Sequence, residues 1–134
     1  KRLFSNSIES NRKRSEIISA AHIYRGCAIA CTAPGTENAR LLSAQAADEL
    51  LEVSGVKASF VIFDSGNDSV NISARSYGDL NVQIIMEYLG GGGHRTMAAA
   101  QLTGVNMEKA KSKLCEAIDA KYPRTDGEEP TPIS

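Results

Sequence analysis

Aromatic residues are scarce in this sequence of 134 residues: they make up 5% of it, and tryptophan is absent. The formal net charge is also small, at −1. Proteins that track a single nucleic-acid strand combine a basic groove with aromatic side chains on which bases stack. Neither feature is visible here, and no overall field draws the chain to an anionic membrane. Any binding of an anion must therefore depend on a local arrangement of donors.

Cysteine and histidine are also few. The three cysteines are Cys27, Cys31 and Cys115, and there are two histidines. An odd number of cysteines without C-x-x-C spacing indicates neither a disulfide framework nor a zinc site, and we expect this chain to bind no metal or other cofactor. We interpret the cysteines as small core residues in a reducing, cytosolic setting. No apolar run is long enough to cross a bilayer, so we expect no membrane contact from this segment.

The first half of the chain predicts alternating helices and strands. Residues 1–22 read as a lead-in helix or linker that packs on something outside this sequence, and Cys27–Cys31 as a buried strand. A helix then follows, with Thr36 at its start and Gly55 at its end. Its apolar positions recur at helical spacing and line one face: Ala39, Leu42, Ala46, Leu50 and Val53.

A hairpin is predicted next, from strands over 58–63 and 70–75 that flank a cluster of turn residues. The second strand alternates strictly between apolar and polar positions. Its polar face consists of Asn71, Ser73 and Arg75.

The second half predicts three helices. Asn81 caps a short helix over 82–89 that stops at the glycine run, and a second helix begins near His94 and carries 97–100. A last helix runs over 107–121, with Asn106 as its cap and Pro123 as its stop. Residues 123–134 read as a disordered tail. The fold class is α/β: a single domain, over about 23–122, with a small mixed β-sheet covered by helices.

The run Gly90–Gly93, followed by His94, is the strongest candidate for a site. Glycine lowers the stability of regular structure by about 0.5–1 kcal/mol relative to alanine, so four together need a geometric reason. We expect their N–H groups to face an anion at the start of the following helix, with Arg95 and Thr96 as further donors. The alternative is a flexible loop between helices. The run fits neither a Walker A loop nor a dinucleotide-binding fingerprint.

The polar strand face offers a second set of donors. Arg75 at its end can bind a phosphate or a base edge in a forked geometry, with Ser73 beside it. The alternative for Arg75 is a surface arginine with a carboxylate partner, and taken alone this alternative is favoured.

Four segments together resemble the DHH-associated domain, the C-terminal domain of DHH-family phosphoesterases. They are Ser73–Ser76, Asn81–Glu87, Gly90–His94 and Ala98–Leu102. Within that superfamily the sequence is most similar to the GdpP-type (YybT-type) cyclic di-AMP phosphodiesterases. Nucleases of the RecJ type usually have Ala-Ala-Gly after the glycine–histidine block, and Ala98-Ala99-Ala100 stands here instead.

The resemblance implies a division of labour. A separate DHH domain would hold two Mn²⁺ ions, and the parent would hydrolyse cyclic di-AMP to the linear dinucleotide pApA. The present chain would bind the substrate and be inactive alone. GdpP-type parents usually carry membrane-spanning and sensor segments as well, which would place this domain on the cytoplasmic side. The implied substrate-binding residues are Gly91, Gly92, Gly93, His94, Arg75, Ser73, Asn81 and Thr96.

Two alternatives remain open at this point. One is a single-stranded nucleic-acid-binding module of a RecJ-like exonuclease or an oligoribonuclease, whose binding would depend steeply on salt. The other is a domain that mainly mediates formation of a homodimer by its parent. The expected partners are thus a cyclic dinucleotide or short nucleotide, the DHH domain in the same parent chain, and a second copy.

Overall fold

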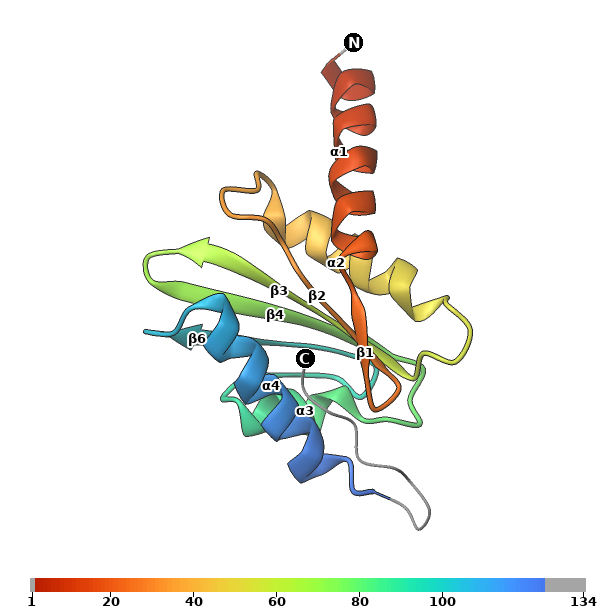
Figure 1. Cartoon of the computed structure of the whole chain (residues 1–134), viewed down its shortest axis with the longest axis vertical. Coiled ribbons are helices and arrows are strands. Elements are labelled where there is room, and N and C mark those ends of the chain that lie inside the picture. Colours follow the sequence, from red (N-terminus) through yellow and green to blue (C-terminus); the bar gives the residue numbers. More distant parts are fainter. Residues whose placement is uncertain (1, 125–134) are drawn as a thin grey trace.

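The computed structural model describes residues 2–124, with side chains from Ile8 onward, and folds around one six-stranded sheet (Figure 1). The strand order is β1-β2-β3-β4-β6-β5; β2 and β3 are parallel and the other neighbours antiparallel. The predicted class, a small mixed sheet covered by helices, is confirmed. The elements are α1 (Arg2–Ser19), β1 (His22–Tyr24), β2 (Cys27–Cys31), α2 (Ala39–Leu51), β3 (Ala58–Gly66), β4 (Ser69–Ser76), α3 (Val82–Tyr88), β5 (Gly92–Gly93), β6 (Met97–Thr103) and α4 (Met107–Lys121).

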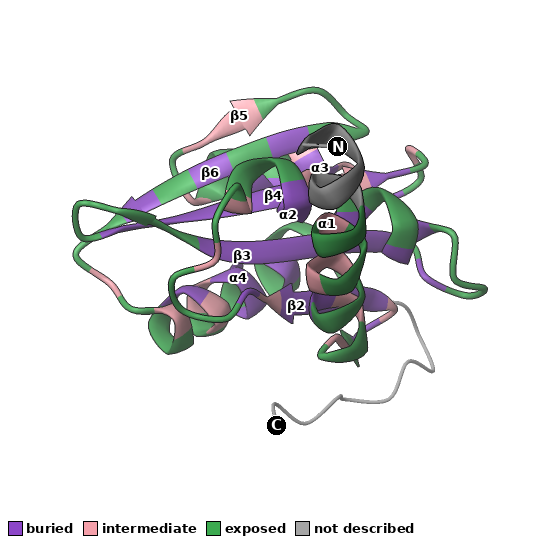
Figure 2. Ribbon diagram, turned by 90° about the horizontal axis from the view of Figure 1, so that it is seen from above, coloured by how far each residue is buried: buried purple, intermediate pink, exposed green. Residues whose placement is uncertain are grey.

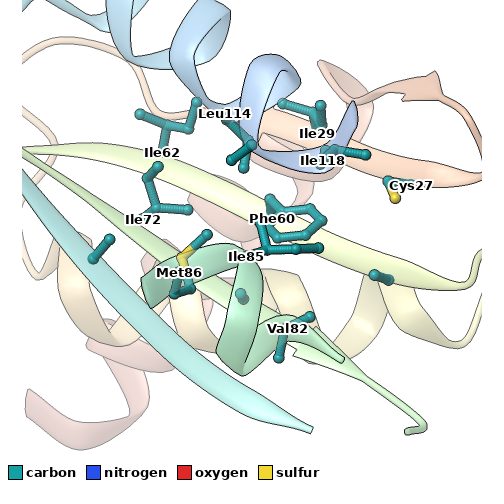
Figure 3. Close-up of a cluster of buried hydrophobic side chains, with 14 of the residues drawn as sticks. Cys27, Ile29, Phe60, Ile62, Ile72, Val82, Ile85, Met86, Leu114 and Ile118 are labelled. Atoms are coloured by element: carbon teal, nitrogen blue, oxygen red, sulfur yellow. The ribbon is translucent and has the colours of Figure 1, made fainter. Parts of the chain in front are cut away.

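Helices cover both faces of the sheet and form two separate cores. On one face α3 and α4 pack on the sheet around Phe60, Ile85 and Leu114, which are fully buried (Figure 3). On the other face α1 and α2 pack over Ala30 and Val61. Strand β3 is buried on both faces, because its alternate side chains enter the two cores.

Two of the four predicted helix caps are confirmed, and the predicted end of the second helix at Gly55 is wrong, because α2 ends at Leu51 with Glu52 as its C-cap. The Asn81 side chain accepts a hydrogen bond from the Gln83 N–H, at 2.9 Å, and Asn106 accepts one from the Lys109 N–H, at 2.8 Å. The predicted Thr36 cap is wrong, because its hydroxyl donates to the Ala33 carbonyl instead.

The last strand, β6, replaces the helix predicted to begin near His94. Burial alternates along Met97–Thr103, with Ala98, Ala100 and Leu102 inward (Figure 2). Alanine favours helices intrinsically, yet this preference is weak beside the pairing of the whole segment with β4. Side chains alternate between exposed and buried over these seven residues. The alternation is not visible in the sequence, because its buried and exposed positions are both alanine in 98–100.

Helix α1 packs on this domain at its C-terminal end. Ile17 is buried against α2, and Arg14 Nε lies 2.9 Å from a Glu49 carboxylate oxygen. The last turns of α1 therefore pack within this chain, and the packing of residues 1–22 on something outside the sequence stays a prediction. The end of the chain, 125–134, where most of the predicted tail falls, lies outside the described residues.

A polar cluster, in which Tyr24 and Arg25 are buried and Asp119 is exposed, joins β1 and the following turn to α4. The Tyr24 hydroxyl donates to Asp119 Oδ2 at 2.6 Å, and Arg25 Nη1 lies 3.0 Å from Asp119 Oδ1. Burial, and then the hydrogen bond to Asp119, raise the pKa of Tyr24 to about 12 from a usual 10.0. Folding thus favours the protonated phenol, and this stabilisation is present below pH 10 and lost as pH rises through about 12.

We expect Tyr24→Phe to lower the free energy of unfolding at pH 8 by about 1.5–3 kcal/mol, because a hydrogen bond to a charged group is lost. The difference between wild type and variant should shrink as the pH approaches the folded-state pKa of about 12. Urea unfolding of both proteins at pH 8 and pH 11 measures this difference. A gap between the two proteins that stays constant with pH would contradict the assignment.

Candidate functional site

The glycine run first closes helix α3. Gly90 has φ 89°, in the left-handed region that favours glycine, and its N–H donates to the Glu87 carbonyl at 3.0 Å. The Gly91 N–H donates to the Met86 carbonyl at 2.8 Å. Glycine commonly ends helices in this way. The first two N–H groups of the run therefore bond to α3 and are not aimed at a ligand.

The rest of the run forms β5 and a tight hairpin with β6. Gly92 and Gly93 pair with Ala99 and Ala98. His94 continues β5: its N–H donates to the Met97 carbonyl at 2.7 Å, and its carbonyl accepts from the Met97 N–H at 3.3 Å. The predicted anion site at a helix N-terminus is therefore wrong, because a strand follows the glycines.

Two of the glycines are required by close packing, contrary to the expectation that the run serves a ligand alone. A Cβ on Gly91 would lie 2.1 Å from the Ala99 carbonyl oxygen, and one on Gly93 would lie 2.5 Å from Ala98 Cα. Gly93 also has φ 143°, a conformation that side chains rarely adopt. Gly92 differs, since nothing lies within 4 Å of its would-be Cβ.

The tip of the hairpin is fixed by the segment between β4 and α3. Ser76 donates its N–H to the Thr96 carbonyl at 3.0 Å and its hydroxyl to the Arg95 carbonyl at 3.2 Å. The Val82 N–H also donates to the Arg95 carbonyl, and Arg95 Nε donates to the Gly78 carbonyl at 2.7 Å. These bonds hold the tip from both sides, so the preceding residue, His94, stands on a well-supported turn.

Strand register brings several polar and small residues to one face of the sheet. Residues directly opposite one another in paired strands, and residues two apart along a strand, share a face. Two cross-strand rows on the α2 side of the sheet follow from the pairing: Gly92–Ala99–Ser73 and His94–Met97–Arg75.

We call this surface the open face, defined by Ser73, Arg75, Gly92, His94, Met97 and Ala99. Helix α2 covers β3 and part of β4 there, and β5 and β6 lie beyond the helix (Figure 2). His94, Met97 and Ala99 are exposed, and Met97 retains 51% of its accessible surface. Adjacent strands lie about 4.8 Å apart, so the backbones of His94 and Arg75 are about 10 Å apart. The open face therefore presents one histidine and one arginine in the same cross-strand row.

Comparison with known proteins places the chain in a family. The DHHA1 domain matches residues 27–121, which is most of the chain. The chain belongs to the DHHA1 domain family.

Relatives of this DHHA1 domain include three cyclic-di-AMP phosphodiesterases. Identity is 50% over 118 residues with GdpP of Geobacillus thermodenitrificans, covering 87% of this chain and 18% of the relative. It is 46% over 111 residues with PdeA of Listeria monocytogenes (82% and 17%) and 41% over 124 residues with GdpP of Bacillus subtilis (90% and 19%). The chain thus spans less than a fifth of the length of each, and the predicted resemblance to the GdpP type is confirmed.

Solved structures share the fold. An exopolyphosphatase-related protein from Bacteroides fragilis aligns with a TM-score of 0.71 and 20% identity, over 85% of this chain and 35% of that one. A pGpG-specific phosphodiesterase from Vibrio cholerae, PggH, aligns with a TM-score of 0.58 and 15% identity, over 84% and 39%.

The DHHA1 domain brings together four of the eight predicted substrate-binding residues. Gly92, His94, Ser73 and Arg75 lie on the open face. The other four have structural positions: Gly91 and Gly93 pack against β6, the Asn81 side-chain oxygen Oδ1 caps α3, and Thr96 occupies the hairpin tip.

Arg75 is held by a carboxylate, as its alternative interpretation stated. Its Nε lies 3.0 Å from Asp48 Oδ1, and its Nη1 donates to the Ala74 carbonyl at 2.9 Å. Sequence reasoning missed Asp48, because it lies 27 positions away on α2 and no local pattern connects the two. It also missed Met97 and Ala99 as parts of the face, because the run of alanines does not show the period of two along β6.

The cysteines occupy structural positions. Cys27 and Cys115 are buried in the core under α4, and burial raises the pKa of Cys27 to about 12. Within residues 2–124, no three His, Cys, Asp or Glu side chains are grouped so that they could hold a metal ion. No helix in the described part of the chain is long and apolar enough to span a membrane.

The glycines of the run should respond differently to the same substitution. We expect Gly91→Ala to lower the free energy of unfolding by about 1–3 kcal/mol, because the added methyl would overlap the β6 backbone. Gly92→Ala is the matched control and should change stability by less than about 1 kcal/mol, since its methyl would enter open space. Urea unfolding of the two variants tests this. Equal destabilisation would contradict the packing assigned to Gly91.

Proposed function

We propose that this DHHA1 domain binds the substrate of a cyclic di-AMP phosphodiesterase through its open face. The observation that carries the proposal is the juxtaposition of His94 and Arg75 in one cross-strand row, beside Gly92 and Ser73 in the next. The relatives' names supply the nucleotide class.

Each residue has a role that its position allows. The exposed imidazole of His94 can donate to a phosphate oxygen or stack on a base. Gly92 leaves open space, so a ligand can approach the β5 backbone closely. Arg75 offers a guanidinium from β4 at the border with α2, and Ser73, which is 8% exposed, lies beside it on the same strand. A face with few donors should bind weakly, and we assign tight binding to closure against a second domain.

The same proposal assigns hydrolysis to a separate DHH domain. The described residues do not fit a two-manganese centre, because they lack a group of metal-ligating side chains. We therefore propose that the metal ligands of the parent lie outside this chain, that residues 1–22 lead in from the DHH domain, and that the domain works on the cytoplasmic side. Manganese-dependent hydrolysis of cyclic di-AMP by the purified chain would contradict this division.

Replacement of His94 tests the proposal by calorimetric titration of the 134-residue chain with cyclic di-AMP. We expect His94→Ala to weaken binding about tenfold or more, since a hydrogen bond to a charged group is lost. Gly92→Ala should also weaken binding, because its methyl occupies the ligand side of the face. Ile84→Ala is the control: Ile84 is exposed on α3, across the sheet from the open face, and its loss should leave affinity unchanged.

Other outcomes favour the alternatives. Affinity for cyclic di-AMP that is unchanged in both His94→Ala and Gly92→Ala would contradict a role for the open face. If the parent protein also dimerises through this domain, the two results together would indicate an assembly module. Absence of dinucleotide binding together with steeply salt-dependent oligonucleotide binding would indicate a nucleic-acid module instead.

A further inference from the structure

We infer that Asp48 on α2 competes with the substrate phosphate for Arg75 and thereby selects against phosphate groups that carry two charges. The inference rests on the proposed function, since it concerns the same open face. It assigns Asp48 as a specificity-determining residue that acts through Arg75.

The contacts of Arg75 leave its guanidinium partly available. Nε bonds to the Asp48 carboxylate and Nη1 to the Ala74 carbonyl, and no described residue accepts a hydrogen bond from Nη2. The Arg75 side chain retains 13% of its accessible surface, whereas the Asp48 side chain retains 64%. The partner that covers the guanidinium is thus itself in solvent.

Such a pair is easily exchanged. An ion pair with one partner in solvent contributes little stability, whereas a phosphate can bind a guanidinium through two parallel hydrogen bonds. A phosphate oxygen that replaces Asp48 at Nε can reach the unused Nη2 at the same time. Asp48 therefore holds Arg75 in a defined position when no ligand is bound. A phosphate can replace Asp48 with only a small loss of free energy, because the ion pair is exposed.

The displaced carboxylate stays close to the bound phosphate and repels it. Repulsion between charges grows with the charge on the ligand, so it is larger for a terminal phosphomonoester than for a phosphodiester. The cyclic dinucleotide contains diesters only, whereas the linear product pApA ends in a monoester. Asp48 should therefore disfavour the product more than the substrate and assist its release.

Helix α2 supplies a matched control one residue away. Glu49 carries the same charge, its side chain is 54% exposed, and it pairs with Arg14 on α1 at 2.9 Å. Glu49→Gln removes one negative charge from the same helix without freeing Arg75. A general change in the electrostatic field of the domain would affect both variants equally. Release of Arg75 from its carboxylate partner would occur only in Asp48→Asn.

The experiment follows the Arg75 Nε–H signal by NMR while inorganic phosphate is added to the 134-residue chain, and then measures affinity for cyclic di-AMP and for pApA. We expect Asp48→Asn to raise the apparent affinity for phosphate, measured from this Arg75 signal, about two- to fivefold, because an exposed ion pair is lost. Asp48→Asn should also tighten binding of pApA by a larger factor than binding of cyclic di-AMP. Asp48→Glu should restore wild-type behaviour, and Glu49→Gln should match wild type.

The outcomes separate this inference from the proposed function. An Arg75 response in Asp48→Asn equal to that in Glu49→Gln would overturn the inference, even if both nucleotides bind in a His94-dependent manner. Equal tightening for the two nucleotides would overturn the selection against the product. A stronger phosphate response in Asp48→Asn, with no dinucleotide bound by any variant, would support control of Arg75 by Asp48 and contradict the proposed function.

Discussion

The close approach of the glycine segment to β6 is the constraint on which the candidate site depends. Gly91 and Gly93 have no room for a side chain, because the backbone of β6 fills the space. This contact allows β5 to pair with Ala98 and Ala99 and places His94 in the same cross-strand row as Arg75. A larger residue at either glycine would move the hairpin, and the open face would lose its geometry.

Much of the fold follows from the sequence, and the main error, in the segment after His94, has a clear physical origin. The hairpin of β3 and β4, the last helix and two asparagine caps are set by local patterns, and they were predicted. The segment after His94 was misread, because alanine has a strong helix propensity and strand pairing is a long-range effect. The predicted anion site at a helix N-terminus is wrong for the same reason, because it required a helix after the glycine run. The candidate site residues were predicted from the glycine run, the polar strand face and the resemblance, and the structure places four of the eight on the open face.

The open face, which we propose as half of a binding site, presents one histidine and one arginine. The arginine is already paired with Asp48. The hairpin holds His94 in place, so this donor needs little reorganisation when a ligand arrives. The small number of donors fits a surface that closes against another domain. The proposed division between substrate binding here and chemistry elsewhere assigns only one of these roles to this chain, which covers less than a fifth of the length of each relative.

The central claim is that cyclic di-AMP binds on the α2 side of the sheet, over β5 and β6. Backbone amide NMR spectra of the chain, recorded while cyclic di-AMP is added, test it most directly. The account predicts that shifts concentrate at Gly92, His94, Met97 and Ala99 on the hairpin, with smaller ones at Ser73 and Arg75 on β4. Shifts concentrated on α3 and α4, across the sheet, would contradict it.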